Sequence, residues 1–160
     1  MSKKNIKTNA MRLLESENID YNFYTYSVEK EHVDGVTAAK AIGKDPKSVF
    51  KTLVTQANSK EYYVFVIPVG ENLDLKKAAK VSKEKKVEMI HVKDITKVTG
   101  YIRGGCSPLA MKKVYKTFID KSAKDQDKII VSAGKIGYQI ELSAEKLIKI
   151  LDASFEELTI

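Results

Sequence analysis

Residues 49–69 read VFKTLVTQANSKEYYVFVIPV, which is two apolar runs separated by a polar segment. Residues 49–55 and 62–69 are rich in β-branched and aromatic side chains, which favour strands. Asn58-Ser59-Lys60 lies between them and is typical of a turn. The segment therefore predicts a β-hairpin.

A second hairpin is predicted near the C-terminal end. Residues 128–132 and 136–142 are apolar runs on either side of Gly134-Lys135. Strands joined by a short turn run antiparallel, whereas a doubly wound sheet needs a crossover between parallel strands. The two hairpins therefore indicate a mixed or antiparallel sheet.

Helical patterns alternate with these strands. Apolar residues spaced at i, i+4, i+7 and i+8 predict a first helix from Ile6 to Leu14. Ser143 is expected to cap a last helix that ends at Leu151. The other expected elements are helices over 37–42 and 75–82, a helical turn over 93–98, and strands over 21–26, 87–92 and 114–119. We therefore expect a single α/β (α+β) domain over residues 1–160.

The chain is basic, with a formal charge of +7 from 28 Lys and Arg against 21 Asp and Glu. In the helix predicted over 75–82, the buried face is expected to consist of Leu75, Ala78, Ala79 and Ser82. Its solvent-exposed face carries lysines, among them Lys76, Lys80 and Lys83. A lysine-rich surface attracts polyanions such as nucleic acid, and it also keeps a helix soluble. Both interpretations remain open at this point.

The composition of the sequence also indicates where in the cell the protein is expected. No apolar run approaches the ~20 residues that span a bilayer. The segment Met1–Asn5 is polar and lacks the apolar region of a secretory signal. The one cysteine cannot form an internal disulfide. We expect a cytoplasmic protein that does not interact with membranes.

A glycine-rich loop precedes two lysines. Residues 104–108 read Gly-Gly-Cys-Ser-Pro, and Lys112 and Lys113 follow shortly after. Glycine allows backbone angles that other residues resist, and Pro108 restricts both itself and Ser107. This combination predicts a stiff, exposed loop whose N–H groups bind a carbonyl oxygen or a phosphate.

Lys51 is the most unusual polar residue of the first hairpin. On strict alternation it shares one strand face with Val49 and Leu53. If that face is the inner one, Lys51 is a cation in a mostly apolar pocket. The alternative is that its side chain reaches solvent from an edge strand. Tyr26 ends an earlier strand, where it either presents its hydroxyl to a site or packs half-buried.

A cysteine nucleophile and a metal site both have little support in the sequence. Cys106 lies in the glycine loop, where N–H groups could lower its thiol pKa. A nucleophilic cysteine also needs a base, and the two histidines, His32 and His91, show no recognisable pairing with it. A small hydrophobic role for Cys106 is favoured. We expect no metal, because two isolated histidines and one cysteine match no ligand spacing.

Taken together, the sequence resembles the YbaK-type aminoacyl-tRNA deacylases, which are related to the editing domain of some prolyl-tRNA synthetases. The similarity runs from the first helix to about Phe155. It rests on several ordered segments: residues 24–26, 50–54, 73–80, 85–89, 99–101, 104–109, 131–135 and 140–142. The closest subgroup removes cysteine that has been mischarged onto proline tRNA.

The resemblance implies a fold and a set of roles. The fold is a mixed α/β domain with a curved, barrel-like sheet. Lys51 matches a lysine that holds the terminal adenosine or phosphate of the tRNA. Gly104 and Gly105, followed by Cys106, Ser107 and Pro108, match a loop that positions the aminoacyl carbonyl. Tyr26 matches a tyrosine that lines the same pocket.

The resemblance also implies a mechanism that needs no cofactor. In the cysteine-specific subgroup, the thiol of the substrate attacks its own ester carbonyl, which releases the tRNA and a cyclic thiolactone. The protein then has only to orient the ester and stabilise charge on its carbonyl oxygen. The expected partner is aminoacyl-tRNA rather than DNA. Whether the protein acts alone or docked to prolyl-tRNA synthetase stays open, as does activity on cysteinyl-tRNA(Cys).

The chain departs from the family pattern at three positions. Cys106 replaces an aliphatic residue, Ala110 stands where glycine is common, and Gln139 stands where some relatives carry an acid near the site. These departures leave two alternatives to cysteine removal. One is a deacylase for another small amino acid such as alanine, and the other is a non-catalytic module that binds tRNA or oligonucleotides.

Overall fold

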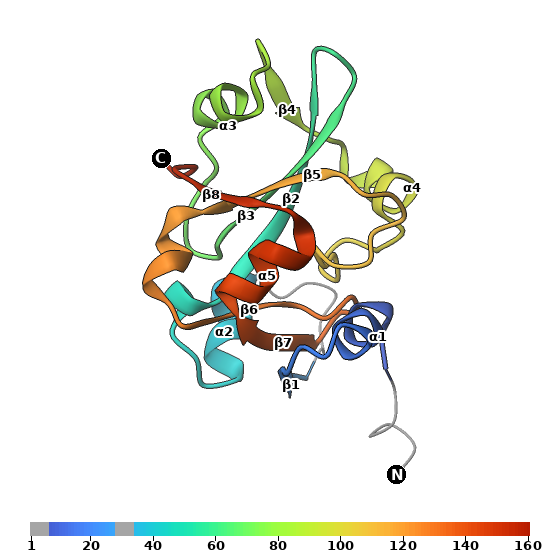
Figure 1. The fold of residues 1–160 in the computed structure, drawn as a ribbon, viewed down its shortest axis with the longest axis vertical. Coiled ribbons are helices and arrows are strands. Elements are labelled where there is room, and N and C mark those ends of the chain that lie inside the picture. Colours follow the sequence, from blue (N-terminus) through green and yellow to red (C-terminus); the bar gives the residue numbers. More distant parts are fainter. Residues whose placement is uncertain (1–6, 28–33) are drawn as a thin grey trace.

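A computed structural model describes residues 7–27 and 34–160. Figure 1 shows the order and arrangement of the elements. The helical elements are α1 (Asn9–Ser16), α2 (Gly35–Ala41), η2 (Pro46–Ser48), α3 (Leu75–Ser82), η3 (Val92–Asp94), α4 (Ile95–Thr99), η4 (Lys121–Asp125) and α5 (Ala144–Leu151). The strands are β1 (Asn22–Thr25), β2 (Phe50–Ala57), β3 (Tyr62–Pro68), β4 (Val87–Met89), β5 (Lys116–Asp120), β6 (Lys128–Ser132), β7 (Tyr138–Ser143) and β8 (Ser154–Glu156).

In the part of the chain that the structure describes, the strands form two sheets. The smaller has the order β1-β7-β6 and is antiparallel throughout. The larger has the order β4-β2-β3-β5-β8, with antiparallel pairing on one side of β3 and parallel pairing on the other. A parallel bridge between Val49 and Ile130 links the two sheets. The expected mixed α/β class and both hairpins are confirmed.

Strand β3 shows why apolar clusters lie on both faces of the larger sheet. Val64 and Val66 belong to the main apolar cluster, together with side chains of β6, β7 and α5. Phe65 and Ile67 point to the opposite face, where they pack with Ala78 of α3 and other apolar residues. Successive side chains of a strand alternate between faces, so an uninterrupted apolar run is what a strand covered on both faces requires.

Side-chain caps begin the four longest helices within residues 7–27 and 34–160. The Thr8 side chain accepts a hydrogen bond from Met11 N at the start of α1. The side chains of Asp34, Asp74 and Ser143 do the same for α2, α3 and α5. These oxygens satisfy N–H groups that have no partner within the helix. The predicted cap at Ser143 is confirmed.

Several helices and strands differ from the expected boundaries. The strand expected over 87–92 ends at Met89, because Val92 begins η3. Helix α1 begins at Asn9, and Ile6 lies outside the described residues. Val114 is 99% exposed, so β5 begins only at Lys116. Gly137 has a φ of 87°, which ends the second hairpin turn and delays β7 to Tyr138. Within the described residues, no helix is long and apolar enough to cross a membrane.

Candidate functional site

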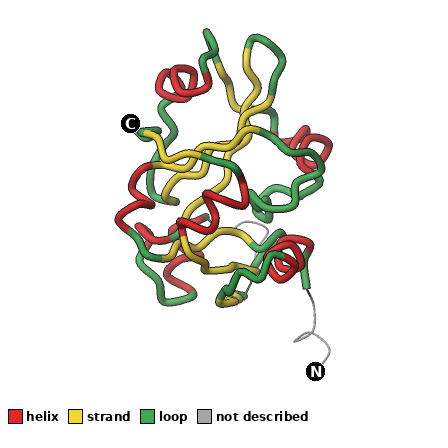
Figure 2. The backbone as a smooth tube through the Cα atoms, viewed as in Figure 1, coloured by secondary structure: helices red, strands yellow, loops and turns green. Residues whose placement is uncertain are grey.

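A cleft of about 520 Å³ opens where the first half of β2 approaches the smaller sheet. Besides residues 49–54 and Val69, several further segments contribute to its wall. They are Tyr26 after β1, the start of α2, the β4–α4 connection, the glycine loop, and Ser132 with Gln139 on β6 and β7. The cleft therefore joins parts of the chain that are distant in sequence. Figure 2 distinguishes the helices, strands and loops of the chain in the same view as Figure 1.

Lys51 faces this cleft from an inner strand of the larger sheet. Strand β2 lies between β4 and β3, and Lys51 pairs with Ile67 of β3. Burial lowers the pKa of the Lys51 ammonium, and the Glu71 carboxylate acts in the opposite direction. No hydrogen bond or ion pair ties its Nζ to the described residues. Because β2 is not an edge strand, the edge-strand interpretation of Lys51 is wrong, and this half-buried residue lies on the cleft wall.

The glycine loop begins with a tight turn. Gly105 N donates to Ile102 O at 3.0 Å, and Gly104 between them has a φ of 87°. A positive φ at this position of a turn favours glycine. A Cβ on Gly105 would lie 3.0 Å from Ile136 N, so the loop packs directly against the β6–β7 connection. Gly104 lines the cleft, whereas the N–H of Gly105 is already used within the turn.

The second half of the loop is buried, which corrects the prediction of an exposed loop. Ser107 and Leu109 are fully buried, and Pro108 is buried as well. The hydroxyl of Tyr101 donates to Leu109 O at 2.6 Å, and Leu109 joins the main core. Ser107 accepts a hydrogen bond from Leu109 N through its Oγ at 3.2 Å. Ser107 and Pro108 therefore support the loop from its buried side, and neither residue lines the cleft.

Cys106 lines the cleft as a neutral thiol. Burial raises its pKa to about 11, and a hydrogen bond with Thr99 opposes this only in part. The possibility that loop N–H groups lower this pKa is thus wrong, because loss of solvent outweighs them. His91 lines a different pocket, and His32 lies outside the described residues. The small hydrophobic role of Cys106 fits these surroundings.

Gln139 and Ser132 are cross-strand neighbours that both reach the cleft. Gln139 is 9% exposed, and its Oε1 has no hydrogen-bond partner among the described residues. Thr52 Oγ1, also on the cleft wall, is buried without a partner in the same part of the chain. Buried polar atoms normally have partners, so these two oxygens are unusual features of the cleft wall.

The α3 lysines occupy a different surface. Lys76, Lys80 and Lys83 are exposed, as predicted, and none of them lines the cleft. Ala78, Ala79 and Ser82 form the buried face of α3 as expected, but Leu75 is 40% exposed at its first turn. Helix α3 packs next to β4, and none of its residues is among those that line the cleft. The three lysines form a basic face that is separate from the cleft.

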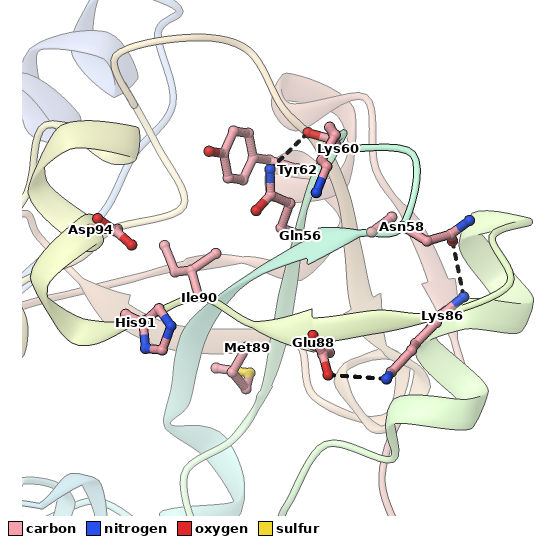
Figure 3. A pocket seen from close by; sticks show the side chains of 11 residues that line it. Gln56, Asn58, Lys60, Tyr62, Lys86, Glu88, Met89, Ile90, His91 and Asp94 are labelled. Carbon is pink, nitrogen blue, oxygen red and sulfur yellow. Dashed lines mark hydrogen bonds and ion pairs between the residues drawn. The ribbon is translucent and has the colours of Figure 1, made fainter.

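Figure 3 shows a smaller pocket of about 230 Å³ at the tip of the β2–β3 hairpin. Its polar groups are largely paired with one another. The Lys86 ammonium lies 3.2 Å from the Glu88 carboxylate, and Gln56 Nε2 donates to Lys60 O at 3.2 Å. The predicted site residues lie elsewhere. Within the described residues, no three His, Cys, Asp or Glu side chains are placed to hold a metal ion.

The polar residues of the cleft that were not singled out from the sequence include Ser132 and Arg103. Ser132 accepts a hydrogen bond from Gly134 N through its Oγ at 3.1 Å, and Arg103 precedes Gly104 in the loop turn. Ser132 lies in a segment that resembles the family, yet alternation alone does not identify it. Arg103 is one of only two arginines in a lysine-rich chain, and this rarity could have marked it as a candidate binding residue.

Comparisons with known proteins agree on one family. The model of the aminoacyl-tRNA editing domain matches residues 30–150. A relative from Enterococcus faecalis (strain ATCC 700802 / V583) is 46% identical over 153 residues, which is 96% of this chain and 93% of the relative. That relative, EbsC, is named as a candidate Cys-tRNA(Pro)/Cys-tRNA(Cys) deacylase.

Two solved structures share the fold at low sequence identity. One, described as a candidate trans-editing enzyme for prolyl tRNA synthetase, has a TM-score of 0.82 and 17% identity, and the match covers 97% of this chain and 99% of the other. The second is a hypothetical protein with a TM-score of 0.84 and 19% identity, covering 93% and 97%. At these identities the likeness shows the fold alone.

Proposed function

Because this chain belongs to the aminoacyl-tRNA editing domain family, we propose that it is a trans-editing deacylase. Its substrate is tRNA(Pro) mischarged with cysteine, and cysteinyl-tRNA(Cys) is a second substrate of the same chemistry. The name of the Enterococcus relative supports this choice of substrate. The protein acts in the cytoplasm, where tRNA is charged and used.

The observation that carries the proposal is the composition of one cleft. Lys51, Gly104, Cys106, Tyr26 and Gln139 come from separate segments and all line it. They offer a partly desolvated cation, a loop amide and polar groups that lack partners, which suits a polar ester end. The described cleft residues include no histidine that could activate Cys106.

Lys51 and Gly104 are the residues that act on the ester end. Lys51 holds the terminal nucleotide, because its ammonium lies inside the cleft without an ion-pair partner among the described residues. The Gly104 N–H donates to the ester carbonyl oxygen as negative charge develops there. Gly105 supports this geometry through its close packing against Ile136.

Substrate-assisted cleavage explains how such a site works without its own nucleophile. The thiol of the bound cysteine attacks the carbonyl carbon, a C–S bond forms, and the C–O bond to the ribose breaks. The thiol proton ends on the ribose oxygen, so the products are uncharged tRNA and a cyclic thiolactone. Intramolecular attack of this kind reaches effective molarities of about 10⁵ M or more, so orientation supplies much of the rate.

The remaining predicted residues define the amino-acid pocket and the tRNA surface. Tyr26 and Gln139 bind polar groups of the aminoacyl end, and Cys106 limits the volume of the side-chain pocket. Ser107 and Pro108 contribute by holding the loop. Lys76, Lys80 and Lys83 attract the tRNA body, and prolyl-tRNA synthetase is the partner that supplies tRNA selectivity.

The test compares tRNA(Pro) charged with cysteine, alanine or serine in the presence of the protein. We expect rapid loss of the cysteinyl ester and much slower loss of the seryl ester, because a hydroxyl is a weaker nucleophile than a thiol. Faster loss of the alanyl ester would reassign the substrate and remove the thiol from the mechanism. Binding of all three without ester loss would mean a non-catalytic tRNA-binding module.

A further inference from the structure

Two cations line the cleft in different surroundings. Among its described residues, Lys51 and Arg103 carry the positive charges and Asp34 the negative one. Lys51 is half-buried on β2, and its desolvation lowers its pKa. Arg103 is exposed on the glycine loop. The cleft thus has one cation inside and one at its edge.

The backbone that carries Arg103 is held in place. Arg103 and Gly104 are the central residues of the turn closed by the hydrogen bond from Gly105 N to Ile102 O. Gly105 packs against the backbone of Lys135 and Ile136, with its ideal Cβ position 3.2 Å from Lys135 C. The loop then continues into the core at Leu109. The Arg103 side chain therefore starts from a fixed point beside the cleft.

The guanidinium of Arg103 is available for a ligand. It has no hydrogen bond or ion pair with the described residues. The other arginine, Arg12, lies on the surface of α1 and contacts Asn9 Oδ1 at 3.5 Å. Nearly all other cations are lysines. Arginine differs from lysine because its planar fork binds two oxygens of one phosphate.

We infer that Arg103 binds the phosphodiester that joins the terminal nucleotide of the tRNA to the preceding one. This inference rests on the proposed function. If the aminoacyl ester lies inside the cleft near Lys51, the first phosphodiester behind it lies toward the cleft edge. Arg103 is the cation at that edge, so the two cations bind different parts of the tRNA end. Lys51 holds the terminal nucleoside, and Arg103 anchors the strand behind it.

The test uses two substrates that differ by the phosphodiester. One is cysteinyl-tRNA(Pro), and the other is cysteinyl-adenosine, which carries the same ester and no phosphate. Arg103→Gln is compared with Arg12→Gln, which removes the same charge outside the cleft, and with Arg103→Lys. We expect Arg103→Gln to raise KM for the tRNA about tenfold, with kcat little changed. For cysteinyl-adenosine, neither constant changes, and Arg103→Lys recovers only part of the affinity.

A second measurement does not depend on ester cleavage. The affinity for uncharged tRNA(Pro) is followed as a function of salt. Arg103→Gln should reduce the log–log slope by about 0.7, the value for one phosphate neutralised on a single strand, whereas Arg12→Gln should not. An equal loss on both esters, or an unchanged KM and salt slope, overturns the role of Arg103. Absence of deacylation by the parent protein overturns the proposed function instead, and the salt slope still decides about Arg103.

Discussion

Gln139 on β7 lies directly across from Ser132 on β6, and both side chains enter the cleft. The Oε1 of Gln139 is buried and lacks a partner among the described residues. A buried acceptor without a partner is unfavourable, so we expect Gln139 to lower the stability of the fold.

Gln139→Leu should make the protein more stable and less active. Leaving a buried acceptor unpaired costs about 1–3 kcal/mol, and leucine removes that acceptor. We expect the free energy of unfolding in urea to rise by about 1 kcal/mol and deacylation of cysteinyl-tRNA to fall. The control is Gln56→Leu, since Gln56 Nε2 has a partner in Lys60 O. A Gln139→Leu protein that is less stable than its parent would contradict this account.

Gly105→Ala should damage both the fold and the site. The added Cβ would lie 3.0 Å from Ile136 N and 3.2 Å from Lys135 C, so the backbone of the loop or of the β6–β7 connection must shift. Such overpacking costs about 1–3 kcal/mol. Thermal unfolding and deacylation should both show the damage. Gly70→Ala is the matched control, because its nearest side-chain atom, Val36 Cγ2, is 3.8 Å away. Equal effects of the two substitutions would argue against the close packing.

Cys106→Ser should retain substantial activity. Burial raises the pKa of the Cys106 thiol to about 11, so at pH 8 only roughly one molecule in a thousand carries a thiolate. The protein thiol is therefore a poor nucleophile, and serine is close to it in size. The measurement is deacylation of cysteinyl-tRNA by both proteins. An inactive variant, with an acyl group trapped on Cys106 of the parent, would identify a thiol-nucleophile hydrolase.

The pH dependence of alkylation checks the same assignment. Because the pKa is raised, the neutral thiol dominates below pH 11, and the rate with iodoacetamide should rise about tenfold per pH unit up to that value. The urea-unfolded chain should instead level off near pH 8.5, the ordinary thiol pKa. The difference also means that this burial contributes stability that is fully present below pH 8.5 and lost as the pH rises toward 11.

Replacing Lys76, Lys80 and Lys83 by glutamine should weaken tRNA binding and its salt dependence. For each duplex phosphate that is no longer neutralised, the log–log slope falls by about 0.9. The control replaces exposed Lys128, Lys146 and Lys149, which changes the net charge equally on β6 and α5. If both triple variants show the same slope as the parent, the α3 lysines only keep the helix solvated.

Local patterns predicted the elements well because their causes are local. The hairpin of β2 and β3 follows from apolar runs around a turn, and Ser143 caps α5 through a hydrogen bond to a residue three positions away. Ala110 has a φ of 57°, which accounts for the glycine that the family resemblance favours there. The prediction that Leu75 is buried was wrong. Periodicity identifies the apolar face of a helix, but it does not show where the surface that this face packs against ends.

The cleft could be predicted only in part because it is a long-range feature. The resemblance identified Lys51, Gly104 and Gln139, but neither alternation nor charge brings β2, the glycine loop and β7 together. The Val49–Ile130 bridge does so, and it pairs residues 81 positions apart. Burial of the loop after Cys106 likewise depends on Leu109 entering the core, which a Gly-Pro pattern does not reveal.

The most direct test of the central claim is single-turnover deacylation of cysteinyl-tRNA(Pro) by the parent protein and by Lys51→Ala. Lys51 is the cation inside the cleft, and removing a charge-assisted hydrogen bond of about 1.5–3 kcal/mol should slow the reaction by one to two decades. Because Lys51 is partly desolvated, its removal should leave the thermal unfolding midpoint unchanged or higher. Lys51→Arg should recover only part of the rate. A folded Lys51→Ala protein that deacylates at the parental rate would contradict the assignment of this cleft as the active site.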